Sequence, residues 1–129
     1  MTFISEFFAD GATIRFGGRT TGAEVLEAKR KFFGHKFEKN PVYVLCDFTH
    51  VEKLEVSADD IERIVSQDLR AAHKNPALAE VIIAPEPHQF GLARMWEQQV
   101  TDERPHTHVT KTREGAIQWL KEQDITVGG

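Results

Sequence analysis

Two segments near the C-terminus, residues 90–97 and 113–120, constrain the fold more than any other feature of the sequence. Each has apolar residues at helical spacing, and each follows a short stretch that has the pattern of a β-strand. The chain therefore closes as strand, helix, strand, helix. Because this alternation is typical of a parallel sheet with helices packed on it, the sequence predicts an α/β fold.

The first part of the sequence predicts a β-hairpin followed by a helix. Residues 2–8 and 13–16 have the pattern of two short strands, and an Asp-Gly pair between them is a turn signal. Thr21 then has the pattern of a helix N-cap, with Glu24 three residues later completing a capping box. We expect this helix to bury its phenylalanines and to expose its lysines to water.

The middle and the end of the sequence supply the remaining elements. Residues 42–48 are almost continuously apolar, as expected of a central strand covered by helices on both faces. Ser57 caps the next helix and Thr112 caps the last one. With further strands at residues 81–84 and 106–111, the prediction is a mostly parallel sheet of about five strands, with an antiparallel N-terminal hairpin strand and four helices.

Length and cysteine content favour a single domain in a reducing compartment. A chain of 129 residues can bury a hydrophobic core without disulfide bonds, and we predict one domain over residues 1–129. The single cysteine, Cys46, lies in an apolar run, which indicates a buried, unreactive thiol. The first residues lack a basic and apolar leader pattern, and no later stretch approaches the roughly 20 apolar residues of a membrane span. We therefore expect a cytoplasmic protein without membrane insertion.

The charge balance argues against nucleic-acid binding. Sixteen basic and twenty acidic side chains give a formal net charge of −4, whereas phosphate binding requires a basic surface. One local group of cations stands out. It could contact an acidic partner, or it is a solvated face near a helix C-terminus, where the helix dipole favours cations. The group comprises Lys29, Arg30, Lys31, Lys36 and Lys39.

Four short motifs carry a resemblance to a known fold group. They are Cys-Asp-Phe-Thr at residues 46–49, Ile-Ala-Pro at 83–85, Gly-Leu-Ala-Arg-Met-Trp-Glu at 91–97 and Glu-Gly-Ala-Ile-Gln-Trp-Leu at 114–120. With these motifs the sequence resembles the SpoIIAA-like fold group, which holds the STAS anti-sigma-factor antagonists and the CRAL-TRIO lipid-binding domains. It is most similar to the small bacterial STAS/CRAL-TRIO-like proteins. The resemblance covers almost the whole chain and implies a sheet of successive β-α units, often in a homodimer.

The resemblance also draws attention to one hydroxyl group. In the sporulation-type STAS proteins, phosphorylation of a serine at the N-terminus of the helix after the central strand breaks a kinase interface. Ser57 aligns with that region, although the glycine of the family's pattern is missing here. Ser57 is therefore a candidate phosphoacceptor, and a plain helix N-cap is the favoured interpretation.

A first group of candidate ligand-binding residues follows from the topology. In open α/β sheets, ligands bind beyond the carboxyl ends of the parallel strands, and this rule selects Asp47, His50 and His88. The alternative is that Asp47 bonds the backbone amides of the turn that follows it. In that case both histidines are solvated loop residues.

A second group lies on one predicted helix. Gly91 would let a ligand approach the backbone, and Arg94 could meet an anionic group. Phe90 and Trp96 could wall an apolar pocket or a dimer contact. Alternatively, Trp96 belongs to the core, Gly91 packs tightly against the sheet, and Arg94 pairs with Glu97.

The sequence shows no catalytic motif and no cofactor fingerprint, so neither catalytic residues nor a cofactor is predicted. His106 and His108 alternate along a strand and supply only half of a zinc site, so no metal is predicted either. The first hypothesis is a non-catalytic bacterial regulatory or protein-interaction module of the STAS-like type, acting as a homodimer or on a protein partner. The alternatives are a binder of a small amphipathic or lipid-like ligand, and an unrecognised enzyme that uses Asp47, His50 or His88 as acid or base.

Overall fold

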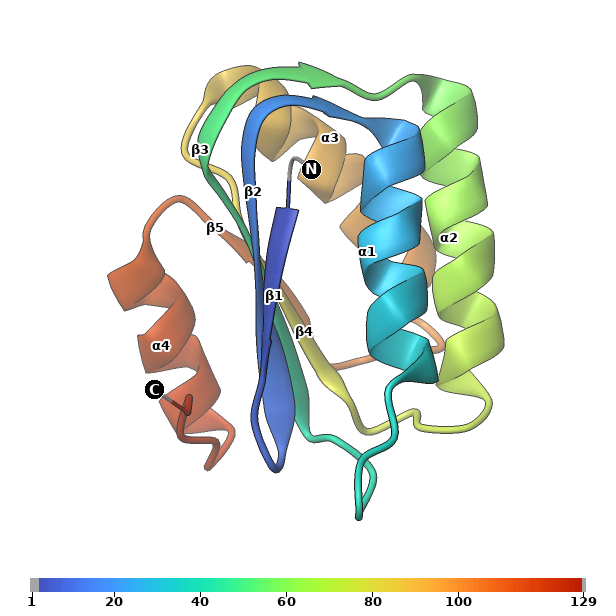
Figure 1. Cartoon of the computed structure of the whole chain (residues 1–129), viewed down its shortest axis with the longest axis vertical. Helices are drawn as coiled ribbons and strands as arrows, with labels where there is room; N and C mark the ends of the chain where they lie inside the picture. The colour runs from blue at the N-terminus through green and yellow to red at the C-terminus, as the bar shows by residue number, and fades with distance from the viewer. Residues whose placement is uncertain (1–2, 129) are drawn as a thin grey trace.

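A five-stranded mixed sheet divides the molecule into two layers of helices (Figure 1). The computed structural model describes residues 3–128. The strands are β1 (Phe3–Phe7), β2 (Gly11–Thr21), β3 (Tyr43–Glu55), β4 (Ala79–Ile83) and β5 (Thr107–Thr110). They follow one another across the sheet in chain order. β1 is antiparallel to β2 and all other neighbours are parallel, which confirms the predicted fold class.

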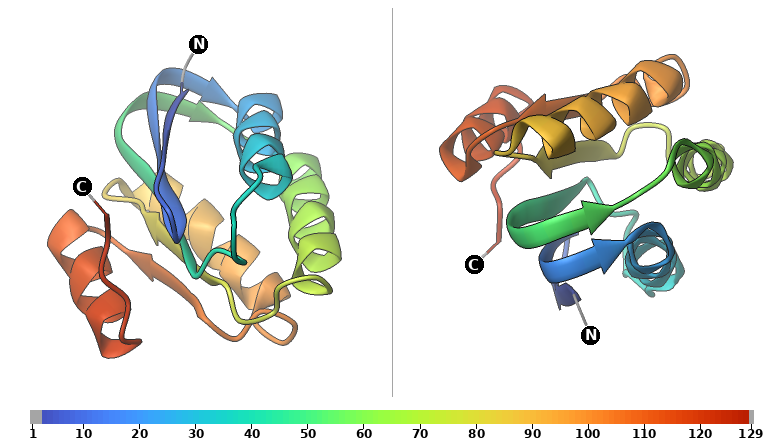
Figure 2. Two further views of the ribbon diagram at one scale, coloured as in Figure 1. Left: turned by 60° about the horizontal axis from the view of Figure 1, so that its bottom comes forward. Right: turned by 90° about the horizontal axis from the view of Figure 1, so that it is seen from above.

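The helices are distributed unequally over the two faces of this sheet. They are α1 (Gly22–Gly34), α2 (Ala58–Ala72), α3 (Pro87–Val100) and α4 (Arg113–Glu122). The first three connect parallel strands that progress in one direction across the sheet, and right-handed crossovers of this kind place their helices on one face. The last helix follows the final strand and covers the opposite face (Figure 2).

Local sequence signals set the starts of the helices where they were predicted. The hydroxyl group of Thr21 accepts a hydrogen bond from the backbone N–H of Glu24, and the Glu24 carboxylate accepts one from the Thr21 N–H. Ser57 and Asp60 form the same reciprocal capping box at α2. Thr112 caps α4 by accepting a hydrogen bond from the N–H of Gly115 at 3.0 Å. Each cap satisfies backbone donors that the first helical turn leaves unpaired.

β2 and β3 extend well beyond the strands predicted for them. β3 was predicted to end at Phe48, but it continues to Glu55 and stays paired with β2 to the end. β4 ends opposite Asp47, so the outer parts of β2 and β3 form a two-stranded arm. Two register shifts and a positive φ of 64° at Gly18 accompany the bend of this arm over the helices (Figure 1).

Strand alternation divides the core between the two faces of the sheet. Val44, Cys46 and Phe48 of β3 pack in the cluster shared with α1, α2 and α3. Tyr43 and Leu45 point the other way, into the cluster shared with α4. The prediction of a central strand with both faces covered is therefore confirmed.

One predicted exposure is wrong. Lys29 was predicted to lie on the solvated face of α1, but it is only 3% exposed. Its side chain contacts Asp68 of α2 and Trp96 of α3. The remaining cations of that predicted group that lie on α1, Arg30 and Lys31, are exposed. Lys29 shares the inward face of α1 with Val25, Ala28 and Phe32, because these positions recur at helical spacing.

None of the helices in residues 3–128 is both long and apolar enough to cross a membrane.

Candidate functional site

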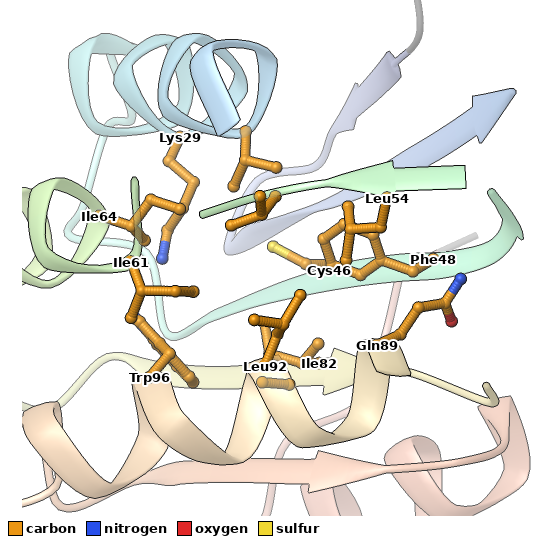
Figure 3. A pocket seen from close by; sticks show the side chains of 13 residues that line it. Lys29, Cys46, Phe48, Leu54, Ile61, Ile64, Ile82, Gln89, Leu92 and Trp96 are labelled. Atoms are coloured by element: carbon orange, nitrogen blue, oxygen red, sulfur yellow. The ribbon is translucent and has the colours of Figure 1, made fainter. Parts of the chain in front are cut away.

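An apolar cavity of about 50 Å³ lies where α1, α2 and α3 meet the start of the β2–β3 arm (Figure 3). Side chains from three helices and two strands line it, so that segments distant in the sequence converge there. Its lining consists of Val25, Lys29, Cys46, Phe48, Leu54, Val56, Ile61, Ile64, Ile82, Gln89, Leu92, Ala93 and Trp96.

The lining changes from one end of the cavity to the other. Lys29 and Cys46 are buried, and we call their part of the cavity its closed end; Leu54, Leu92 and Ala93 are half-buried, and we call their part its mouth. The only polar side-chain atoms come from Lys29, Cys46, Trp96 and Gln89. Because so much of the wall is aliphatic or aromatic, this cavity favours apolar atoms over water.

A buried charge cluster, made of Lys29, Asp68, Glu80 and Arg104, lies behind the closed end. The Lys29 Nζ donates to Asp68 Oδ2 at 2.5 Å and lies 3.4 Å from Glu80 Oε2. Arg104 donates to the carbonyl oxygens of Asn75 at 2.9 Å and Asp68 at 3.4 Å. Its Nε atom lies 3.7 Å from Glu80 Oε1. The cluster ties α1, α2 and β4 to the chain that follows α3.

Trp96 joins the cavity wall to this cluster. Its indole N–H donates to Asp68 Oδ2 at 2.5 Å, while the Lys29 ammonium lies 4.8 Å from the centre of the indole ring. Lys29 is therefore held by two carboxylates and an aromatic face. The cation cannot pair with another anion unless it gives up part of this arrangement.

Burial and mutual interaction shift the titration of these groups. Burial by itself disfavours the ammonium form of Lys29, but Asp68 and Glu80 more than offset this effect and raise its pKa above the ordinary value. Burial, reinforced by the neighbouring Asp68, raises the pKa of Glu80 to about 7. Burial raises the pKa of the Cys46 thiol to about 12, which agrees with an inert side chain.

The candidates at the carboxyl ends of the strands lie apart from the cavity. The Asp47 Oδ1 accepts hydrogen bonds from the backbone N–H and the hydroxyl group of Thr49, at 2.9 and 2.5 Å. By strand alternation Asp47 points to the α4 side of the sheet, away from the cavity. His50 and His88 are exposed, but they lie in β3 and in the first turn of α3 and not in loops. Within residues 3–128 no hydrogen bond or ion pair joins either histidine to Asp47. This geometry provides no acid–base pair.

Of the second group of candidates, all of which lie on α3, only Trp96 lines the cavity. Arg94 is exposed and its Nη1 lies 2.8 Å from Glu97 Oε1, which matches the alternative pairing considered from the sequence. Phe90 is half-buried with the Lys111 ammonium 5.1 Å from its ring centre. Gly91 is exposed. The sequence missed Leu92 and Ala93, although their position next to Trp96 on an amphipathic helix was a usable signal.

Ser57, His106 and His108 lie away from the cavity. Ser57 is exposed and serves as the N-cap of α2, with the Asp60 carboxylate hydrogen-bonded to its backbone N–H at 3.0 Å. His108 stacks on Trp119 with ring centres 5.1 Å apart, and His106 precedes β5. In the part of the chain that the structure describes, no group of three or more histidine, cysteine or acidic residues is arranged to hold a metal ion.

Gly91 gives a direct test of the α3 surface. A Cβ atom at this position would have no atom within 4 Å, so it is not packed against the sheet. Replacing Gly91 by alanine is expected to raise the free energy of unfolding by about 0.5–1 kcal/mol, because alanine restricts the unfolded chain and favours the helix. Urea denaturation followed by circular dichroism measures the change.

Gly115 provides the matched control for this substitution. It also lies in a helix, but a Cβ there would lie 2.4 Å from Thr110 Oγ1, so Gly115→Ala is expected to destabilise the protein. A loss of stability in Gly91→Ala as well would contradict the assignment of Gly91 to an open helical surface.

Comparison with known proteins identifies the fold. No protein-family profile matches the sequence, and no curated protein matches it significantly. The solved structure of the anti-sigma factor antagonist SpoIIAA in its unphosphorylated form is similar, with a TM-score of 0.62 and 16% identity over 97% of this chain and 99% of that chain. The protein therefore has the SpoIIAA-like α/β fold, as its motifs predicted.

A second solved structure has the same fold description. It is an uncharacterised protein of the DUF3478 family from Shewanella loihica PV-4 with a SpoIIAA-like fold, 17% identical over 92% of this chain and 91% of that chain, with a TM-score of 0.47.

Proposed function

We propose that this protein is a non-catalytic bacterial regulatory module of the STAS-like type that holds a small amphipathic ligand in the cavity between α1, α2 and α3. The cavity is the observation that carries the proposal. It is apolar, it lies between three helices and the sheet, and the half-buried residues at its mouth give a ligand access from solvent. The regulatory role is an extension from the SpoIIAA-like fold, since SpoIIAA is an anti-sigma factor antagonist.

The size of the cavity limits what it can accept. An engineered apolar cavity of about 150 Å³ binds benzene, whereas the cavity described above has about 50 Å³. It therefore accommodates the end of an alkyl chain. The polar head of such a ligand would remain at the mouth, in contact with solvent, because the Lys29 ammonium is already neutralised at the closed end.

Binding of 1-hexanol tests this proposal, because it combines an alkyl chain with an uncharged polar head. We expect saturable chemical-shift changes for the methyl groups of Leu92, Ile61 and Ile64 in an NMR titration. Ala93→Leu places a larger side chain at the mouth and should weaken the binding by about tenfold or more. These methyl groups report on the cavity directly, since all three residues line it.

The control variant is Gln98→Leu, which places leucine at an exposed position of the same helix and should leave binding unchanged. Linear, non-saturating shifts in the wild type would overturn the ligand proposal. Equal binding by the wild type and Ala93→Leu would do so as well.

A separate experiment tests the proposed homodimer. The homodimer and the protein partner are predictions from the resemblance, whereas the cytoplasmic location is a prediction from the lack of a leader pattern and of a long apolar stretch in the sequence. Native mass spectrometry of gently purified protein reports the subunit count and any retained small molecule in one spectrum. A dimer is expected, and a reproducible added mass would identify the natural ligand.

A further inference from the structure

A second hollow, which we name the basic groove, lies at the C-terminal ends of α1 and α2. It has a volume of about 850 Å³ and runs between the last turns of these two helices and the segment of residues 35–41. Phe33, Lys36 and Phe37 line the groove from α1 and the segment that follows it. Arg70 and Lys74 line it from the end of α2, and Arg104 also belongs to the lining. Typical ligand clefts have volumes of about 300–1,000 Å³, so the groove is large enough for a peptide segment.

Positive charge gathers in this groove although the chain as a whole carries a net charge of −4. Five lysine and arginine residues line it, and among the described residues no aspartate or glutamate does. Arg30 is held by Glu27, and Arg104 belongs to the buried charge cluster. Within residues 3–128, Lys36, Arg70 and Lys74 have no carboxylate within 4 Å. Three exposed cations are therefore available to an anionic partner.

Two lining residues also have polar atoms without a hydrogen-bond partner. Among the described residues, the Arg104 Nε and the Gln67 Oε1 are buried and have no hydrogen-bond partner, although the Arg104 Nε lies 3.7 Å from Glu80 Oε1. The Arg104 residue is 0% exposed, and such a buried donor normally finds a partner. The groove therefore offers unpaired surface cations, next to a buried arginine whose Nε atom has only a long contact with Glu80.

Aromatic side chains supply the apolar part of the same groove. Phe33 and Phe37 are half-buried, and both contact the ring of Phe32, with ring centres 5.5 and 5.7 Å from it. Leu78 is buried and lines the groove below them. A groove lined by both cations and aromatic side chains suits a chain segment that carries both carboxylates and apolar side chains.

We propose that the basic groove docks an acidic, partly apolar segment of a partner protein. Lys36, Arg70 and Lys74 pair with its carboxylates, and its apolar side chains pack on Phe33 and Phe37. A short segment contacts only the groove, whereas a nucleic acid would also meet the negative charge of the rest of the surface. This inference goes beyond the proposed ligand cavity, which has a separate lining and does not depend on it.

The probe is a fluorescein-labelled peptide of alternating glutamate and leucine, titrated with the full chain by fluorescence anisotropy. We expect saturable binding that weakens by about tenfold between low and physiological salt, because the contacts are largely between exposed charges. In NMR spectra of the wild-type protein, the backbone amides of Phe33, Phe37 and Lys74 should shift on addition of the peptide. This mapping needs no variant and holds even if a charge reversal impairs folding.

The variant Arg70→Glu/Lys74→Glu should weaken the binding by about tenfold or more. Its control is Lys121→Glu/Lys53→Glu, which makes the same change in net charge at exposed sites away from the groove. Arg70 and Lys121 both lie in the last turn of a helix, so the two variants lose a similar interaction with a helix dipole. The control should bind the peptide like the wild type.

Three outcomes would overturn the proposal. The first is no binding of the peptide at low salt, and the second is equal weakening by both variants. The third is amide shifts confined to residues outside the groove. A single-stranded oligothymidine that bound through these cations, while the peptide did not, would reassign the groove to nucleic acid. Since the hexanol titration reports only on the cavity, failure of one proposal is distinguishable from failure of the other.

Discussion

Replacing Lys29 by methionine is expected to lower the free energy of unfolding by about 3–5 kcal/mol, a larger effect than the replacement of any exposed lysine. Methionine has a similar length but no charge, so the carboxylates of Asp68 and Glu80 would remain buried without their common partner. Breaking a buried ion pair from one side is costly because the remaining charge has no solvent around it. Urea denaturation at neutral pH gives the change directly.

Two further variants isolate the ion pair. Lys39→Met changes a lysine that is exposed and lies outside the helices, and should alter stability by no more than about 0.5 kcal/mol. The double variant Lys29→Met/Asp68→Leu removes both charges, so it should lose less stability than the sum of its single variants. Additive losses would show that the Lys29–Asp68 contact has no net coupling and would contradict this interpretation of the cluster.

Glu80 should make the stability of the protein fall as the pH rises from about 5 to about 7. Its pKa moves from the ordinary value of 4.5 to about 7 on folding, chiefly through burial and then through the neighbouring Asp68. In this interval the unfolded chain has lost the proton and the folded protein keeps it. The folded state therefore binds more protons, and the free energy of unfolding decreases with pH until Glu80 ionises near pH 7.

Glu80→Gln tests the assignment, because glutamine stays neutral at every pH. The difference in unfolding free energy between the wild type and Glu80→Gln should fall by a few kcal/mol between pH 4.5 and pH 7 and then become constant. Denaturant unfolding at several pH values measures it. Glu103→Gln, at an exposed position, should show no comparable fall. A constant difference for Glu80→Gln would mean that Glu80 has an ordinary pKa.

Local signals in the sequence were sufficient for most of the fold. The capping box at Thr21 and the N-cap at Ser57 need only residues three positions apart, and both form as predicted. The apolar run around Cys46 predicted a strand covered on both faces, and the two core clusters confirm it. The end of β3 was predicted too early, because its outer part is held by pairing with β2 and not by continuous hydrophobicity.

The candidate sites were less accessible to the same reasoning. The topological rule selected Asp47, whose carboxylate is bonded to Thr49 on the far side of the sheet from the cavity. Helical periodicity found Trp96, which does line the cavity, but gave no reason to place Lys29 opposite it. These two residues come from different helices, and their contact depends on how α1 and α3 cross the sheet.

By itself, the sequence determined the order of strands and helices, where the helices start and which stretches enter the core, because these depend on interactions between near neighbours in the chain. Only the tertiary structure decided that Lys29 is buried with Asp68 and Glu80, and that Lys36 and Lys74 share one groove. A charge in isolation is more stable in water, so its burial is decided by partners that are 39 and 51 positions away. Packing of the helices on the sheet brings those partners together.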